Sequence, residues 1–127
     1  MRAVVEAIAA HAREALPAEC CGMLIGHDAD ILEARRARNL DPSPGRFLID
    51  PKDHIDARRD ARSRQLAVVG FYHSHPHSEP EPSPTDREEA AYPGHLYLIV
   101  RPLPASSAVR LFRQVDGEFV EVEFSVR

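Results

Sequence analysis

Two histidines and one aspartate are the residues whose types and spacing most directly suggest chemistry. His73 and His75 are two positions apart and directly follow the apolar segment 66–72. Alternate side chains of an extended segment point to the same side, so both imidazoles can reach one metal ion. Asp86, at the start of a predicted helix, can return to supply a third ligand. Two imidazoles and one carboxylate leave a coordination position for water, which is typical of catalytic rather than structural zinc.

Each of these residues also has an ordinary explanation. A histidine pair in a loop is often a polar surface feature, and the spacing from Ser83 to Asp86 fits a helix capping box with Asp in place of the usual Glu. His77 continues the alternate spacing, but it follows Pro76 in a proline-rich loop, and we do not expect it to be a ligand. The remaining histidines are isolated in the sequence and are predicted to lie at the surface: His11, His27, His54 and His95.

A hydrolytic metal site also needs a base that accepts a proton from water and a donor that holds the developing oxyanion. Glu19 is a candidate base. Its local sequence, between Pro17-Ala18 and a predicted strand, is ordinarily that of a solvated residue. Local spacing alone therefore favours no catalytic role for Glu19.

The segment 73–86 resembles the signature of the JAMM (MPN-plus) metalloproteases. It reads His-Ser-His-Pro, then seven residues between His75 and Ser83, then Ser-Pro-Thr-Asp, as in the family pattern H-x-H, seven residues, S-x-x-D. The flanks agree, since Gly-Phe-Tyr precedes the histidines and the segment 17–22, with Gly26, is similar to the one that carries the family's glutamate. The resemblance extends from the first predicted helix to at least Val100.

By that resemblance, His73, His75 and Asp86 would hold one zinc ion per chain. Glu19 would be the general acid and base, and the Ser83 hydroxyl would stabilise the tetrahedral intermediate. The implied activity is that of a zinc metalloprotease or isopeptidase, in which a zinc-activated water hydrolyses an amide bond.

The resemblance also implies a substrate class. Small prokaryotic proteins of this pattern resemble enzymes that act at the C-terminal Gly-Gly tail of a ubiquitin-like or sulfur-carrier protein and release cysteine, a conjugated lysine or a peptide. We expect such a carrier protein to be the partner, bound through its tail as an added strand beside an exposed sheet edge. We expect neither a nucleic acid nor a membrane to be a partner.

Two alternatives stay open from the sequence. A non-catalytic MPN-like scaffold module would keep the fold for binding, in the manner of the RadC-like proteins near DNA, and would use the arginines at 35–38 and 58–64. An iron-dependent enzyme would also use two histidines and one carboxylate around open positions. Glu19 and Ser83 have no evident purpose in that iron chemistry.

The elements that must position these residues follow from the apolar pattern. Helical spacing predicts a first helix over 4–16, ended by Pro17, and a second over 51–64 with Asp50 as its N-cap. A loop over 76–84 leads into a short helix that ends near residue 91. The predicted strands cover 21–25, 31–38, 46–49, 66–72, 96–100, 109–115 and 118–126, the last two as a hairpin. The predicted fold is mixed α/β, with a single curved mixed β-sheet flanked by helices in one domain over 1–127. The resemblance makes this domain MPN/JAMM-like, related to the cytidine deaminases.

Composition limits the class of protein. The residues are 43% hydrophobic and 28% charged, which suits one compact domain, and a net charge of −4 argues against a generally basic, nucleic-acid-binding surface. The apolar runs are much shorter than the roughly 20 residues of a membrane-spanning helix. The N-terminus lacks the apolar stretch of a secretory signal. Cys20 and Cys21 are neighbours, which disfavours a disulfide between them and predicts reduced thiols near the core. We therefore expect a cytoplasmic protein.

Overall fold

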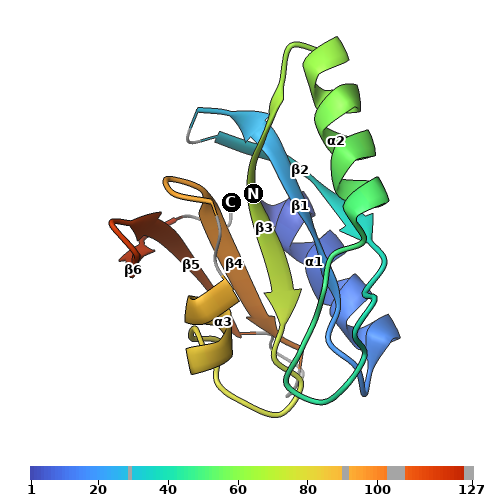
Figure 1. Ribbon diagram of the computed structural model, residues 1–127, viewed down its shortest axis with the longest axis vertical. Coiled ribbons are helices and arrows are strands. Elements are labelled where there is room, and N and C mark those ends of the chain that lie inside the picture. The colour runs from blue at the N-terminus through green and yellow to red at the C-terminus, as the bar shows by residue number, and fades with distance from the viewer. Residues whose placement is uncertain (29, 90–91, 103–107, 125–127) are drawn as a thin grey trace.

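The computed structural model describes residues 1–28, 30–89, 92–102 and 108–124, which form a six-stranded β-sheet with helices packed on its faces (Figure 1). The helices are α1 (Arg2–Ala15), α2 (Pro51–Ser63) and α3 (Pro84–Glu89). The strands are β1 (Cys21–His27), β2 (Asp30–Ala37), β3 (Ala67–Ser74), β4 (Leu96–Arg101), β5 (Ala108–Val115) and β6 (Glu118–Val122). Their order in the sheet is β2-β1-β3-β4-β5-β6.

The pairing of β3 with β4 distinguishes the middle of the sheet from the rest. Among the strands of the described residues, this pair alone is parallel, and the other four pairs are antiparallel. The predicted mixed sheet flanked by helices is therefore confirmed. A parallel pair requires a crossover connection, and this crossover carries α3. The segment after His75 is this crossover, which leaves the end of β3, passes through α3 and returns to β4 beside it.

Alternation along the central strands gives each face of the sheet its own core. The core under α1 includes Val4, Ile8, Ala12, Leu24, Tyr72 and Leu98. The core under α2 includes Met23, Ile25, Ala57, Ala61, Val68 and Phe71. In β3, Tyr72 therefore faces α1, whereas Phe71 and His73 face the side of α2. Both faces of β3 therefore contribute to a core, and at the end of the strand the α2 side carries His73.

One predicted strand is wrong. Residues 46–49 form no strand, and only an isolated bridge joins this segment to Asn39. The Asn39 side chain explains the difference, because its Oδ1 accepts the backbone N–H groups of Asp41 and Leu48, both at 2.9 Å. These bonds close residues 40–48 into a loop at its base.

The isolated histidines were predicted to lie at the surface. His27 and His77 are exposed, as predicted. The prediction is wrong for three others, which are partly buried: His11, His54 and His95. A ring nitrogen of His11 lies 2.7 Å from the hydroxyl of the buried Tyr72. The rings of His54 and His95 pack against Phe71. These contacts join residues that are far apart in the sequence, so spacing along the chain does not reveal them.

The other predicted elements lie close to the observed ones. The N-cap of α2 is Asp50, whose Oδ1 accepts the N–H of Lys52 at 2.9 Å. Cys20 and Cys21 are buried free thiols, as predicted. β6 ends at Val122, short of the predicted end at 126, and the predicted end of α3 near 91 lies outside the described residues.

Several arginines of the two clusters pair with acidic side chains. Arg64 pairs with Glu33 and Asp60, and Arg35 also pairs with Asp60. Such exposed pairs contribute little to stability, and they offset part of the positive charge of these arginines. Within the described part of the chain, no helix is both long enough and apolar enough to cross a membrane.

Gly70→Ala tests the close approach of β3 and β4. A Cβ at position 70 would lie 2.1 Å from the carbonyl oxygen and 2.7 Å from the carbonyl carbon of Leu96, so the two backbones must separate. We expect the free energy of unfolding, measured with urea, to fall by about 1 to 3 kcal/mol. The control Leu32→Ala, at a side chain 57% exposed, should stay within about 0.5 kcal/mol of the wild type. A Gly70→Ala variant as stable as this control would contradict the expectation.

Candidate metal centre

The ends of β1 and β3 bring Glu19, His73 and His75 together. Two hydrogen bonds join the start of β1 to the end of β3: Ser74 N donates to Cys20 O at 3.2 Å, and Cys20 N donates to Ser74 Oγ at 2.8 Å. Glu19 immediately precedes Cys20 and therefore lies beside the histidines. The metal-binding atoms of Glu19, His73 and His75 all lie within 4.8 Å of one another.

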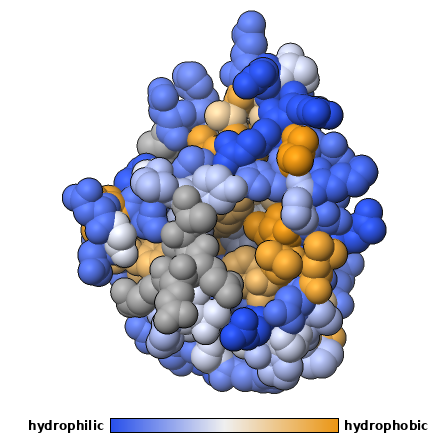
Figure 2. All heavy atoms as spheres, viewed as in Figure 1, coloured by the Kyte–Doolittle hydropathy of each residue, from blue (hydrophilic) through white to orange (hydrophobic). Residues whose placement is uncertain are grey.

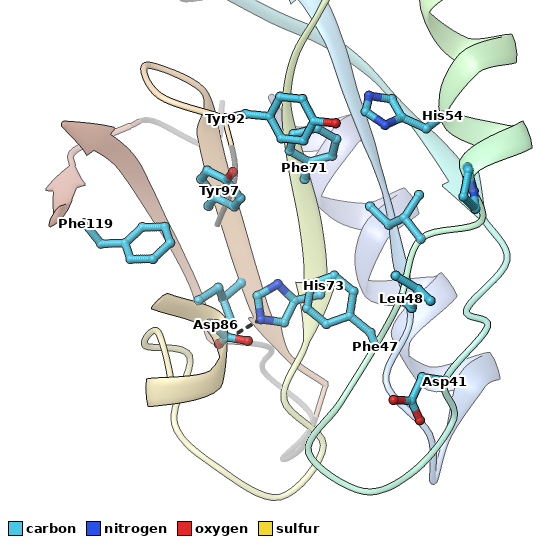
Figure 3. A pocket seen from close by; sticks show the side chains of 13 residues that line it. Asp41, Phe47, Leu48, His54, Phe71, His73, Asp86, Tyr92, Tyr97 and Phe119 are labelled. Atoms are coloured by element: carbon cyan, nitrogen blue, oxygen red, sulfur yellow. Dashed lines mark hydrogen bonds and ion pairs between the residues drawn. The ribbon is translucent and has the colours of Figure 1, made fainter. Parts of the chain in front are cut away.

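Asp86 returns from the crossover to the same point. Its Oδ2 lies 3.1 Å from Nε2 of His73 and 3.0 Å from Nε2 of His75, and the two Nε2 atoms are 3.1 Å apart. Figure 3 shows the Asp86 carboxylate facing the His73 ring. Ligands about 2.0–2.1 Å from a tetrahedral zinc ion lie about 3.3 Å from one another. The three atoms therefore have the spacing of one face of a zinc coordination sphere.

The surroundings of the two imidazoles suit them for metal binding. Nδ1 of His75 lies 2.8 Å from the carbonyl oxygen of Glu79, to which it donates, so Nε2 is the nitrogen that faces Asp86 and could bind a metal. The ring of His73 is stacked on Phe47, with 4.4 Å between ring centroids. Burial lowers the pKa of His73, whereas the hydrogen bonds to Asp86 and Glu79 outweigh burial and raise the pKa of His75. A metal would compete with a proton at His75, and far less at His73.

Ser83 and Asp86 form the reciprocal bonds of a capping box. Asp86 N donates to Ser83 Oγ at 3.0 Å, and Ser83 N donates to Asp86 Oδ2 at 2.9 Å. Burial alone would raise the pKa of Asp86, but the hydrogen bonds from His73 and His75 hold it far below its usual range. The capping box and the predicted site thus use the same residues. The Ser83 hydroxyl accepts a bond from the backbone, and its own proton is available to donate.

Glu19 is buried rather than solvated, in contrast to what its local sequence favours. Its side chain is 7% exposed, and Oε1 has no hydrogen-bond partner among the described residues. The backbone carbonyl of Glu19 accepts a bond from Asn39 Nδ2 at 3.0 Å, which fixes the residue at the end of β1. Burial raises the pKa of Glu19 to about 7. A buried carboxylate oxygen without a partner, next to two imidazoles, is an atom that a bound water or metal would satisfy.

An apolar cavity of about 510 Å³ opens beside this cluster (Figure 3). His73 and Asp86 form part of its wall, and aromatic and aliphatic side chains form most of the rest: Phe47, Leu48, Ile49, Phe71, Tyr92, Tyr97, Ile99 and Phe119. Figure 2 shows apolar side chains gathered around a hollow on this face of the molecule. Leu48, at the rim, is 54% exposed. The polar cluster therefore lies at one end of an apolar pocket.

Sequence reasoning missed the residues of this pocket. They come from residues 47–49, β3, the segment before β4 that contains Tyr92, β4 and β6, and no spacing within any one segment connects them. The available signal was weaker, namely that Phe71 immediately precedes the histidine pair in a buried strand. By contrast, all five predicted site residues, Glu19, His73, His75, Ser83 and Asp86, lie within one connected cluster. His77 is exposed.

Comparison with known proteins gives consistent matches. The sequence model of a family described as prokaryotic homologs of the JAB domain matches residues 1–114. A desampylase of Haloferax volcanii is 41% identical over 105 residues, which cover 76% of this chain and 75% of the relative. A CysO-cysteine peptidase of Mycobacterium tuberculosis is 32% identical over 126 residues, covering 97% and 86%. The solution structure of a Desulfitobacterium hafniense protein superposes with a TM-score of 0.87 at 34% identity, covering 97% of this chain and 88% of that one.

These matches cover the whole of the histidine and aspartate cluster and the strands that carry it. The chain therefore belongs to the family of prokaryotic homologs of the JAB domain.

Proposed function

We propose that this chain is a zinc-dependent peptidase that hydrolyses the amide bond after the C-terminal Gly-Gly of a ubiquitin-like or sulfur-carrier protein. The observation that carries the proposal is the convergence of two imidazoles and the carboxylates of Glu19 and Asp86 on one buried point beside a cavity. Two relatives support the reaction class, since one is named a desampylase and the other a CysO-cysteine peptidase. The chain is accordingly a metal-dependent hydrolase of the JAMM type.

His73, His75 and Asp86 are the proposed zinc ligands. Their three facing atoms have the separations described above, and the Glu79 carbonyl fixes the proton of His75 on Nδ1. When bound, zinc supplies Lewis acidity, which lowers the pKa of a coordinated water toward about 7 and polarises the scissile carbonyl.

Glu19 is the proposed general acid and base. A carboxyl group whose pKa is near 7 can both accept and return a proton at neutral pH, and burial gives Glu19 a pKa of about 7. It takes a proton from the attacking water and delivers one to the leaving amine. The Ser83 hydroxyl, already held by Asp86 N, donates a hydrogen bond to the oxyanion that forms.

The direction of the substrate follows from these roles. Because Glu19 protonates the leaving amine, the leaving group must lie on its side of the metal. The carrier tail then extends to the opposite side, where His73 and Asp86 form part of the cavity wall; among the described residues, neither Glu19 nor His75 lines that cavity. We propose that the tail enters the cavity rather than pairing with a sheet edge, since β2 and β6 are the edge strands and His73 lies on the central β3.

The size of the cavity indicates what precedes the two glycines. About 510 Å³ is far more than two glycines fill, and aromatic rings form much of the wall. The narrow Gly-Gly segment lies beside His73 and Asp86, and a large apolar side chain just before it packs against the aromatic wall of the cavity. Burial of that side chain would add affinity without contacting the reacting atoms.

We further propose that residues 1–127 act as one catalytic domain in the cytoplasm. The proposed catalytic residues come from the start of β1, the end of β3 and the crossover to β4, so one sheet supports all of them. The buried thiols of Cys20 and Cys21 form no disulfide, which suits a reducing compartment.

The first prediction concerns the metal. The purified protein should bind about one zinc ion per chain, and His73→Ala, His75→Ala and Asp86→Ala should each lose it, because two remaining protein ligands bind zinc weakly. Zinc content after gel filtration with a weak chelator measures this. His77→Ala is the matched control and should keep its zinc, since His77 is exposed. If His77→Ala loses zinc while Asp86→Ala keeps it, the ligand set is wrong.

The second prediction concerns the base. Glu19→Gln keeps the shape of the side chain but cannot accept a proton, so turnover should fall about 10² to 10⁴-fold while zinc content stays at the wild-type level. The measurement is release of cysteine from a carrier with a C-terminal Gly-Gly-Cys. Glu118→Gln, at an exposed position in β6, is the control and should retain full activity. Full activity of zinc-loaded Glu19→Gln would rule out the proposed role.

The third prediction concerns the tail. Carriers that differ only in the residue before Gly-Gly should be cleaved with a kcat/KM at least about tenfold higher for Leu than for Asp, because the cavity would bury a charge. A carrier ending in Val-Val-Cys should not be cleaved. Equal cleavage of the Gly-Gly and Val-Val carriers would refute tail recognition, and equal kcat/KM for Leu and Asp would refute the use of the cavity.

A further inference from the structure

Glu79 lies in the loop between the second histidine and Ser83, and it makes contacts through two of its groups. Its carbonyl oxygen accepts from Nδ1 of His75 and from the backbone N of Glu81, both at 2.8 Å. Its carboxylate Oε1 accepts from Nη1 of Arg101 at 2.5 Å. One residue thus joins a proposed zinc ligand to the end of β4.

The end of β4 also holds the backbone of His75 directly. His75 N donates to Val100 O at 2.8 Å, and Val100 is the residue before Arg101. A closed ring of contacts results. It runs from the His75 backbone to Val100, along the chain to Arg101, through the ion pair to Glu79, and from the Glu79 carbonyl back to the His75 ring.

We propose that Arg101 is a positioning residue that acts through Glu79 to orient the imidazole of His75. Val100 fixes the backbone of His75 but leaves its ring free to rotate. The bond from Nδ1–H to the Glu79 carbonyl fixes the plane of the ring and keeps Nε2 directed at the point that it shares with Oδ2 of Asp86. The inference rests on the proposed metal site, because a metal bound at that point needs Nε2 to face it.

The location of Glu79 explains why its carbonyl needs support. Residues 76–83 contain no helix or strand, so no backbone ladder fixes the loop. The position of Arg101 costs free energy of folding, because its Nε is buried without a hydrogen-bond partner among the described residues. The Arg101 side chain is 32% exposed and that of Glu79 is 65% exposed, so the ion pair between them is partly solvated and modest in strength. Stability alone therefore does not account for the pair.

A second arginine offers a matched control. Arg110 reaches the same loop through Glu81 at 3.7 Å, but its main partner is Glu121, which accepts from Nε at 2.9 Å and from Nη2 at 2.6 Å. The Arg110–Glu81 contact reaches the loop two residues from Glu79, and it uses the Glu81 side chain, which is not part of the ring around His75. Removing Arg110 tests whether any loss of loop charge pairing has the same effect.

The experiment compares Arg101→Met, Glu79→Gln, the double variant and Arg110→Met with the wild type. Zinc affinity, measured by competition with a chromophoric chelator, should weaken about three- to tenfold in each of the first two. The double variant should be no weaker than either single one, since both break one link. Arg110→Met should stay within about twofold of the wild type. Equal weakening in Arg110→Met, or additive losses in the double variant, would overturn the proposal.

A second readout uses the metal-free protein. The His75 Nδ1–H proton should give a protected NMR signal in the wild type and in Arg110→Met, and exchange should remove it in Arg101→Met and Glu79→Gln. A protected signal in Arg101→Met would overturn the proposal. This readout separates the two inferences, because a wild type that binds no zinc would refute the proposed function while the signal still tests the positioning role. Glu79→Gln keeps the carbonyl and the size of the side chain, and urea unfolding verifies that each variant is folded.

Discussion

The Oδ2 atom of Asp86 faces two imidazole nitrogens and a backbone N–H, all within 3.1 Å. A buried carboxylate is costly unless several partners stabilise it. These partners come from the end of β3 and from the start of α3, so the crossover between the two parallel strands must close at this point. The loop path, the helix cap and the position of β4 all satisfy that one requirement.

The central strand β3 contributes side chains to both faces of the sheet. Under α1, β3 contributes Tyr72 to a continuous apolar core. On the opposite face, Phe71 and His73 lead from the core beneath α2 into the cavity. Because successive residues of a strand alternate between faces, a single strand anchors the fold and presents a reactive side chain within three positions. The rigidity of the central strand thereby fixes the site.

Local rules account for the part of the site that lies within one segment. The spacing of His73, His75 and Asp86 and the Ser83 cap depend on strand alternation and helix capping, which act over a few residues, and both were predictable. Glu19 was recognisable only through resemblance, because its burial depends on the pairing of β1 with β3 across more than fifty residues of chain. The aromatic cavity was not predictable, since its wall combines segments that lie far apart in the sequence. The strand predicted over 46–49 was wrong for another reason, because the side-chain hydrogen bonds of Asn39 outweigh the β propensity of that segment.

Asn39 has a consequence for how such a protein can change. Its Nδ2 holds the Glu19 carbonyl, while its Oδ1 closes the 40–48 loop at its base. Extra residues inserted within that loop would lie beyond the closure and would leave the backbone of Glu19 undisturbed. Loop-closure entropy rises by only about 0.6 kcal/mol for each doubling of length. The rim of the cavity next to Leu48 can therefore lengthen and diversify while the backbone of Glu19 stays in place, so that evolution or protein engineering can alter selectivity without moving the proposed base.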